Sequence, residues 1–394
     1  MSNHFFSSFY LYKEHKELFL DEPKRAFVQY KKFRLDLLTG KRADVGINKF
    51  FQDLETLKVE DQFENPVVIH LFYELGYSCV GLDVKADENT PLALFIEYTQ
   101  SVEKNIFRSQ EVEPLSFESL SSVSFEEYHQ KFNQVYQNLL DGETYQLNLT
   151  HPFYLRPSKL LSARKFINRL WADPLKVGAF AHTTYVGSLD KLFLSNSPEC
   201  LFQIKQIDKE FKILTMPIKG TLKVEEDNYD DAWQKLERDE KNQAELYMIT
   251  DLMRNDLTRL TMNPANVVHD KYPLHVPGLI HQFSVVESSL SAKENLANIV
   301  KNLFPGGSIT GAPKKNTMEL IEKIEKFKRG FYCGSTILCY KNRKTASINI
   351  RSAEIDYTQN EVTYGAGGGI TLQSQALEEF EETLNKLKSF LLLF

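Results

Sequence analysis

The chain has 394 residues, of which 42% are hydrophobic and 25% charged, and its 47 basic and 53 acidic side chains give a formal net charge of −6. This composition is typical of a globular protein with a sizeable core, and it excludes disordered and fibrous classes. The mild acidity, with lysines and arginines interleaved with glutamates, disfavours nucleic acid as a partner.

The N-terminal segment reaches charged residues within its first turns and lacks the pattern of a secretory signal. No uncharged apolar run in the sequence is long enough to span a bilayer. The four cysteines form no C-x-x-C pair, so we expect small buried side chains rather than zinc ligands or disulfides. Together these features predict a cytoplasmic protein without membrane contact.

The first part of the chain has an irregular pattern. Runs rich in β-branched and aromatic residues at 66–72 and 91–98 predict strands. Residues 100–124 are rich in glutamate and serine and predict a connecting stretch. We therefore expect a divergent N-terminal region over 1–120 and a second region over 121–394.

Helices and strands alternate after residue 120. The periodicity of apolar residues predicts strands at 145–155, 178–184 and 191–195. It predicts helices at 124–140, 159–171, 230–260, 291–303, 313–327 and 376–394. This order predicts an α+β fold, a layered α/β sandwich.

Two acids lie on one apolar face of the helix predicted at 230–260. A rotation of about 100° per residue places Glu245 and Asp256 on the same side as Ile249 and Leu252. A buried carboxylate is costly unless it is paired or binds a metal. The face therefore indicates either a functional acid or a satisfied internal ion pair.

The C-terminal helix has an apolar stripe and an opposite charged face that carries Glu378, Glu379, Glu382 and Lys386. Periodicity alone favours a solvated face. Mg²⁺ would need carboxylates from two elements, with waters completing its octahedron. Glu245 and Glu382 could supply them only if the two helices face each other across one cavity.

Two glycine-rich segments are candidate ligand sites. The segment FPGGSITGAPK at 304–314 enters a predicted helix, whose N-terminus could bind a carboxylate or phosphate, or could simply follow a turn. The segment YGAGGGI at 364–370 precedes the acidic helix. Its glycines could permit positive φ and close approach of a ligand, or could form a plain turn.

Four further side chains are candidates on their local context. Glu199 follows a proline in SNSPE and could be a general acid with a raised pKa, although a surface loop is the alternative. Lys219 in PIKGT could be a desolvated nucleophile or an ordinary surface lysine. For His281 and Arg351, which lie among strand-forming residues, structural roles are the default.

Ten segments in order resemble the motif set of the chorismate-utilising enzymes over 124–388: YQLNLT, SNSPE, PIKGT, AELYMITDLMRNDL, HQFS, FPGGSITGAPK, RGFYCGS, INIRS, GAGGGI and EETLNK. The resemblance implies chorismate as substrate and a large sandwich of two β-sheets flanked by helices. Gln146 stands where the isochorismate and salicylate branches carry a water-activating lysine. Lys219 stands where the anthranilate branch usually has alanine, and lysine there marks the aminodeoxychorismate branch.

The resemblance also implies roles for particular residues. Mg²⁺ would be held by Glu245 and Glu382 with water-bridged help from Glu379. Lys219 would add to C2 of chorismate while Glu199 protonates the departing C4 hydroxyl, and ammonia would then enter at C4 and expel the lysine. His281 would lie near the leaving hydroxyl or the ring. Carboxylate recognition would involve Arg351, Tyr332, Lys386, Thr310 and the glycines Gly367, Gly368 and Gly369.

The expected product is 4-amino-4-deoxychorismate, a precursor of 4-aminobenzoate and folate. The chain contains no Gly-x-Cys-x-Gly elbow of a glutamine amidotransferase. Ammonia is therefore expected from a separate glutaminase subunit or from solution. Asn242 departs from the acid frequent at that position, and no segment resembles the tryptophan-binding motif of relatives. Two alternatives remain: an anthranilate synthase large subunit, and a non-catalytic chorismate-binding scaffold for an amidotransferase.

Overall fold

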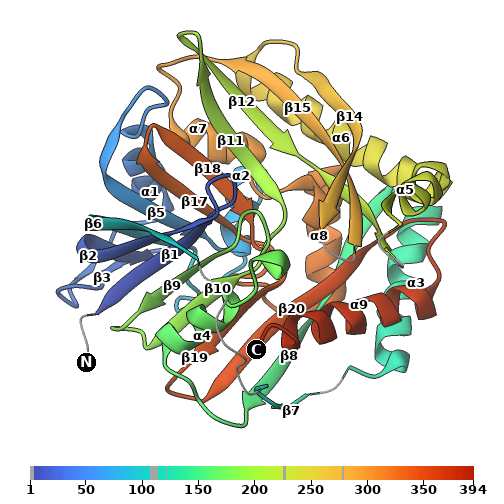
Figure 1. The fold of residues 1–394 in the computed structure, drawn as a ribbon, viewed down its shortest axis with the longest axis horizontal. Helices are drawn as coiled ribbons and strands as arrows, with labels where there is room; N and C mark the ends of the chain where they lie inside the picture. The colour runs from blue at the N-terminus through green and yellow to red at the C-terminus, as the bar shows by residue number, and fades with distance from the viewer. Residues whose placement is uncertain (1–3, 107–113, 122, 225–227, 277–278) are drawn as a thin grey trace.

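The computed structural model describes residues 4–106, 114–121, 123–224, 228–276 and 279–394. Two antiparallel β-layers pack face to face and helices cover their outer surfaces (Figure 1). Each layer joins strands from the beginning and from the end of the chain. The predicted fold class, a layered sandwich of two sheets flanked by helices, is confirmed.

The first layer has the strand order β2-β1-β9-β10-β19-β20-β8, with every neighbouring pair antiparallel. Two short strands, β7 and β16, pair with the ends of β8. The strands are β1 (Phe5–Leu11), β2 (Lys16–Gln29), β7 (Phe117–Ser119), β8 (Gln146–Pro157), β9 (His182–Val186), β10 (Lys191–Ser195), β16 (Gly311–Ala312), β19 (Ser352–Asp356) and β20 (Glu361–Ile370).

The second layer continues from β2 in the order β2-β6-β5-β17-β18-β11-β12-β15, and β13 and β14 pair with β15. Its strands are β3 (Arg34–Asp36), β4 (Arg42–Ala43), β5 (Phe63–Leu71), β6 (Ala93–Asn105), β11 (Cys200–Ile207), β12 (Glu210–Met216), β13 (Ile218–Lys223), β14 (Asn266–Val276), β15 (Leu279–Leu290), β17 (Ser335–Lys341) and β18 (Arg343–Ile348).

The alternation of side chains along each strand builds three layers of core. In β5, Val67 and Ile69 point outward into the core beneath the helices, whereas Val68 points inward between the two sheets. In β10, Leu192 points outward and Phe193 inward. Because both faces of these strands are covered, their sequences read as continuous apolar runs.

Helices cover each outer face. Helices α1, α2, α6 and α7 contribute to the core of the second layer, and α4 and α9 to that of the first. Helices α3 and α8 pack near β8, and α5 packs on β13 (Figure 1). The helices are α1 (Ile47–Glu55), α2 (Gly76–Cys79), α3 (Phe125–Leu140), α4 (Ala163–Leu170), α5 (Tyr229–Arg238), α6 (Glu240–Thr261), α7 (Leu296–Leu303), α8 (Lys314–Glu325) and α9 (Ala376–Leu391), with 3₁₀ turns at Tyr73–Leu75, Pro174–Lys176 and Gly307–Ile309.

The helix predicted at 230–260 is two helices. Asp239 separates them, and its side chain accepts the backbone N–H of Asn242 at 2.9 Å, which caps α6. This cap turns the chain so that the face of α6 that carries Glu245 is set independently of α5. The apolar periodicity continues across the break and therefore conceals it.

The N-terminal region is more regular than its sequence pattern indicates. Strand β1 is buried at all seven positions, including Ser7 and Ser8, so it shows no alternation. It pairs with β9, and β5 pairs with β17, so strands from the first 120 residues enter both layers. The division at residue 120 stays a prediction.

All four cysteines are free thiols, and three of them are buried. Among the described residues, no helix combines the length and apolar character needed to cross a membrane.

Candidate active site

Helix α6, strand β13 and helix α9 bring acids and lysines together beside the glycine strand β20. Lys219 on β13 lies 3.3 Å from the carboxylate of Glu245 on α6, measured from Nζ to Oε2, and both side chains are largely buried. Helix α9 lies along β20 (Figure 1) and contributes Glu379, Glu382 and Lys386. The two helices that the sequence left unconnected therefore contribute to one site.

The glycines of β20 provide space for the side chains opposite them. A Cβ on Gly369 would lie 2.4 Å from Nε2 of Gln146 and 3.1 Å from Nζ of Lys219, and a Cβ on Gly368 would lie 3.0 Å from Oε2 of Glu379. The segment is a strand rather than a turn, and neither glycine has a positive φ. The predictions of positive φ and of a plain turn were therefore wrong, and close approach of a ligand to this backbone stays a prediction.

Glu379 is buried, although it belongs to the charged face of α9. Its Oε1 accepts hydrogen bonds from Nζ of Lys241 at 3.1 Å and from Oγ of Ser374 at 2.7 Å. The prediction of a fully solvated face was wrong here, because Lys241 of α6 and Ser374 contact the Glu379 carboxylate. One helical turn further along α9, Lys386 pairs with Glu382 at 2.7 Å and donates to the carbonyl of Gly367 at 2.8 Å.

The ammonium of Lys241 lies near the carboxylates of α6 and α9. The charge of Lys241 interacts with Glu379, Glu245 and Glu382. Partial desolvation raises the pKa of Glu382, but Lys386, Lys219 and Lys241 outweigh it and hold that pKa below its usual value. The neighbouring ammonium groups thus favour the ionised form of Glu382.

Three carboxylates from two helices lie near the Lys241 ammonium. Carboxylate oxygens are the ligands that a hard divalent cation prefers, so the chemistry of this donor set fits Mg²⁺. Each carboxylate is ion-paired with a lysine in this arrangement. Within the part of the chain that the structure describes, no three His, Cys, Asp or Glu side chains stand close enough together to hold a metal as they are. A bound ion would therefore replace lysine contacts rather than fill a ready-made cage.

Glu199 lies just before β11 and is buried, with 3% of its surface exposed. Its Oε1 has no hydrogen-bond partner among the described residues. Burial raises the pKa of Glu199 to about 7, while the Ser308 hydroxyl and the charge of Lys219 act in the opposite direction. A carboxyl group with this pKa can hold a proton near neutral pH, as a general acid must.

Arg351 lies close enough to His281 for its charge to act on the imidazole. Burial lowers the pKa of the Arg351 guanidinium, and the charges acting on it from the described residues include Tyr364 but no carboxylate. Burial, followed by the charge of Arg351, lowers the pKa of His281 to about 4, so this imidazole is neutral at pH 7. A buried arginine without an acid partner is suited to an anionic ligand.

The remaining predicted residues differ in their placement. The ring of Tyr332 lies against β20, since a Cβ on Gly365 would come within 2.1 Å of it. Burial raises the pKa of Tyr332. The Thr310 hydroxyl donates to the Gly306 carbonyl at 2.8 Å, and its N–H donates to the Gly307 carbonyl at 3.3 Å. Thr310 therefore has no free donor for a carboxylate in this arrangement.

The second acid on the face of α6 has a structural role. Asp256 pairs with Lys314 at 2.6 Å and with Arg259 at 2.8 Å, and both Asp256 and Lys314 are nearly inaccessible to solvent. The sequence left two alternatives for the acids on this helix face, a functional acid or a satisfied internal ion pair, and each of the two acids matches one of them. Asp256 forms a satisfied internal ion pair, and Glu245 faces the lysines of the site.

Two residues at the site were not predicted as members of it. Gln146 is fully buried at the start of β8, and both polar atoms of its amide lack partners among the described residues. Lys241 lies in the first turn of α6, where the helix dipole disfavours a positive charge. The sequence did not reveal the position of Lys241, because periodicity conceals the break before α6, and the burial of Gln146 depends on tertiary packing.

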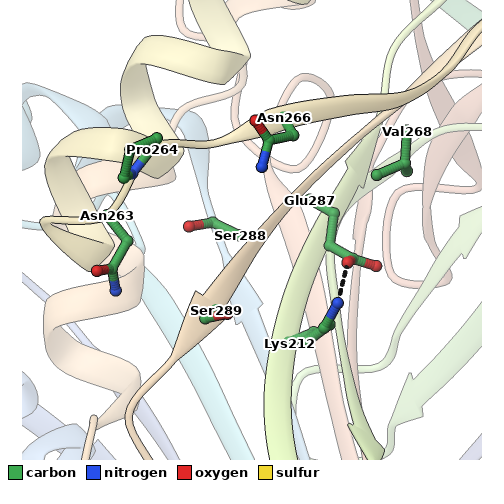
Figure 2. Close-up of a pocket in the computed structure, with 8 residues that line it drawn as sticks. All are labelled: Lys212, Asn263, Pro264, Asn266, Val268, Glu287, Ser288 and Ser289. Carbon is green, nitrogen blue, oxygen red and sulfur yellow. Dashed lines mark hydrogen bonds and ion pairs between the residues drawn. The ribbon is translucent and has the colours of Figure 1, made fainter.

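A hollow of about 300 Å³ lies elsewhere, beyond the C-terminus of α6 (Figure 2). Its lining residues are Lys212, Asn263, Pro264, Asn266, Val268, Glu287, Ser288 and Ser289. Lys212 and Glu287 form an ion pair at 2.7 Å across it. None of the predicted site residues lines this hollow, so it is separate from the candidate active site.

The layered sandwich, with acids and lysines gathered in one site, is typical of an enzyme. Comparison with known protein families identifies the family. The chain belongs to the family of chorismate binding enzymes, whose family model matches residues 50–392. The resemblance drawn from the motifs is confirmed at the level of the family.

Two curated relatives are similar to this chain over most of its length. Aminodeoxychorismate synthase component 1 of Klebsiella aerogenes is 35% identical over 277 residues, which cover 69% of this chain and 58% of the relative. The protein of the same name from Escherichia coli is 33% identical over 294 residues, covering 74% of this chain and 62% of the relative. The matched part of this chain thus spans about three fifths of the length of these relatives.

Solved structures agree on the fold. Anthranilate synthase component I from Streptococcus pneumoniae superposes with a TM-score of 0.78 at 19% identity, covering 96% of this chain and 92% of that chain. An isochorismate synthase from Bacillus anthracis gives a TM-score of 0.73 at 18% identity, covering 100% of this chain and 95% of that chain. At these identities the likeness concerns the fold alone.

Proposed function

We propose that this chain is the large subunit of an aminodeoxychorismate synthase, which aminates chorismate at C4 with ammonia. The observation that carries the proposal is Glu199, a buried acid with a pKa of about 7 on which the charge of Lys219 acts. Two curated relatives with this activity in their names support it. Lys219 in PIKGT supports the same branch over the anthranilate branch.

In the proposed reaction Lys219 and Glu199 act together. Nζ of Lys219, as the neutral amine, forms a bond to C2 of chorismate while both ring double bonds shift, through C1, C6 and C5 to C4, and the C4–O bond breaks. Glu199 gives its proton to the departing oxygen, which leaves as water. Ammonia then bonds to C4, both double bonds shift back, and the C2–N bond breaks to release Lys219 and 4-amino-4-deoxychorismate.

The buried guanidinium of Arg351 would bind a carboxylate of chorismate, with Tyr332, Lys386 and the backbone of the glycine strand Gly367 to Gly369 beside it. Neutral His281 would accept or donate a hydrogen bond near the ring without adding charge. The glycines exclude side chains from the space in front of Lys219 and Gln146. A planar ring can therefore lie against the strand.

We further propose that Mg²⁺ is held by Glu245 and Glu382 with help from Glu379. When bound, the ion would neutralise and orient a substrate carboxylate. The carboxylates of α6 and α9 would bring that charge to the same space as Lys219. Asn242 offers a neutral amide where relatives often have an acid, so the cluster has one less negative charge than is common.

A separate glutaminase subunit is the proposed source of ammonia, because relatives are designated component 1 and this chain contains no amidotransferase elbow. Four free thiols suit a reducing compartment, which supports a cytoplasmic location. The product would serve the synthesis of 4-aminobenzoate and folate.

Trapping of the covalent adduct tests the proposal. The protein is incubated with chorismate and Mg²⁺ without ammonia, quenched in acid, and examined by intact and peptide mass spectrometry. We expect a mass increase of chorismate minus water on the peptide that contains Lys219, and no increase in Lys219→Ala. Lys212→Ala, a lysine far from the site, should form the adduct normally. An adduct on another residue would contradict the proposal.

The alternative functions make different predictions. An anthranilate synthase would release pyruvate, and a non-catalytic scaffold would bind chorismate without turnover. The presence of Glu199, Lys219, Glu245 and Glu382 at one site supports catalysis over the scaffold.

A further inference from the structure

Lys241 occupies an unusual position in the acidic cluster. It is the second residue of α6, where the positive end of the helix dipole disfavours a cation. Its ammonium nevertheless donates to the buried Glu379 on α9 at 3.1 Å. The position of this lysine is therefore determined by the carboxylates across the site rather than by its own helix.

The ammonium also interacts with the other two acids. Glu245 follows Lys241 by one helical turn, and the charges of Glu245 and Glu382 act on Lys241 together with that of Glu379. Lys219 and Lys386 pair with Glu245 and Glu382 respectively. Lys241 contacts Glu379 directly, and its charge also acts on the two acids that these lysines pair with.

We propose that Lys241 is an internal cation that holds the three carboxylates together in the metal-free protein and must be displaced when a divalent ion binds. This inference rests on the proposed function, which assigns those carboxylates to the metal. Without Lys241, the three carboxylates would keep only Lys219 and Lys386 as paired cations, Glu379 would lose its ammonium partner, and repulsion within the cluster would increase. With it, they remain close to one another, but a divalent ion must compete with a tethered positive charge.

The proposal makes opposite predictions for stability and for metal affinity. Removing the charge in Lys241→Met should lower the melting temperature of the metal-free protein, because the acids lose their counter-ion. It should tighten the binding of Mg²⁺ or Mn²⁺ by about tenfold, because repulsion between the two cations is removed. A lysine that only supports the site from outside would instead weaken metal binding when removed.

Calorimetric titration with Mn²⁺ in the absence of chorismate tests this directly, with thermal melts in EDTA and in excess Mn²⁺ alongside. Lys241→Arg keeps the charge and should bind Mn²⁺ like the unaltered protein. Lys212→Met is the matched control, because Lys212 forms a similar, partly exposed ion pair with Glu287 far from these acids. It should leave the affinity unchanged.

Tighter binding by Lys241→Met, or binding by this variant alone, supports the proposal. Unchanged or weaker binding overturns it, and so does the absence of binding by either protein. Should Lys241→Met fail to fold, Lys241→Gln keeps the length and hydrogen-bonding capacity of the side chain and serves in its place. Amination of chorismate, measured separately on the unaltered protein, decides the proposed function independently of this result.

Discussion

Replacing Glu199 by glutamine should stabilise the protein while it abolishes catalysis. Burial raises the pKa of Glu199 from its usual 4.5 to about 7. One pH unit of difference corresponds to about 1.4 kcal/mol. At pH 8, ionising this carboxyl therefore costs about 3 kcal/mol more in the folded than in the unfolded chain. A neutral amide of the same shape avoids that cost.

The sign of the pH dependence follows from the raised pKa. Stability associated with Glu199 is fully present below pH 4.5 and is lost as the pH rises to about 7. The advantage of Glu199→Gln should thus be about 1 kcal/mol at pH 5 and about 3 kcal/mol at pH 8. For 394 residues, the latter corresponds to a melting temperature about 4 °C higher.

Thermal and urea unfolding at pH 5 and pH 8 measure this difference. Glu325→Gln is the control, because Glu325 is equally buried but forms an ion pair with Arg329 at 2.7 Å. That variant should lose about 3–5 kcal/mol, since it leaves a buried charge uncompensated. If Glu199→Gln is equally or less stable at pH 8, burial does not disfavour the ionised form of Glu199, and the argument for Glu199 as a general acid is refuted.

Three further predictions concern other parts of the molecule. Burial lowers the pKa of His182 and of His281 to about 4, so stability should fall as the pH decreases from about 6.5 to 4. The slope should approach about 1.4 kcal/mol per pH unit for each histidine, and urea midpoints that stay constant over this range would contradict it. Gly369→Ala should reduce kcat/KM at least about a hundredfold with little change in melting temperature, because its Cβ would lie 3.1 Å from Nζ of Lys219; near-normal turnover would show that this space is not used. Arg351→Lys should raise KM for chorismate about tenfold or more through loss of bidentate binding, and an unchanged KM would remove Arg351 from substrate recognition.

The sequence predicts the later half of the fold better than the first. The helices near the C-terminus are read from periodicity because each has one apolar face, and β10 is read from its short apolar run. Strand β1 carries no such pattern, since both of its faces are covered and it contains two buried serines. Its place in the sheet depends on pairing with β9, which begins about 170 residues later and which local patterns cannot reveal.

The individual candidates for the site are visible in the sequence, but their assembly is not. Periodicity places Glu245 and Asp256 on one face, and only packing shows that Asp256 meets Lys314 whereas Glu245 meets Lys219. The burial of Glu379 is likewise invisible from its helix alone, because its carboxylate meets Lys241 and Ser374 from outside the helix. The resemblance to the family predicted that these residues share one site, which the local sequence pattern could not.

The most direct test of the account is product analysis with the purified chain, chorismate, Mg²⁺ and an ammonium salt, using mass spectrometry with a parallel assay for pyruvate. The account predicts a product of the mass of aminodeoxychorismate without pyruvate, lost on chelation and in Lys219→Ala. Formation of anthranilate with pyruvate would contradict the assignment of Lys219. Unchanged chorismate in the presence of free ammonia would contradict catalysis by this chain on its own.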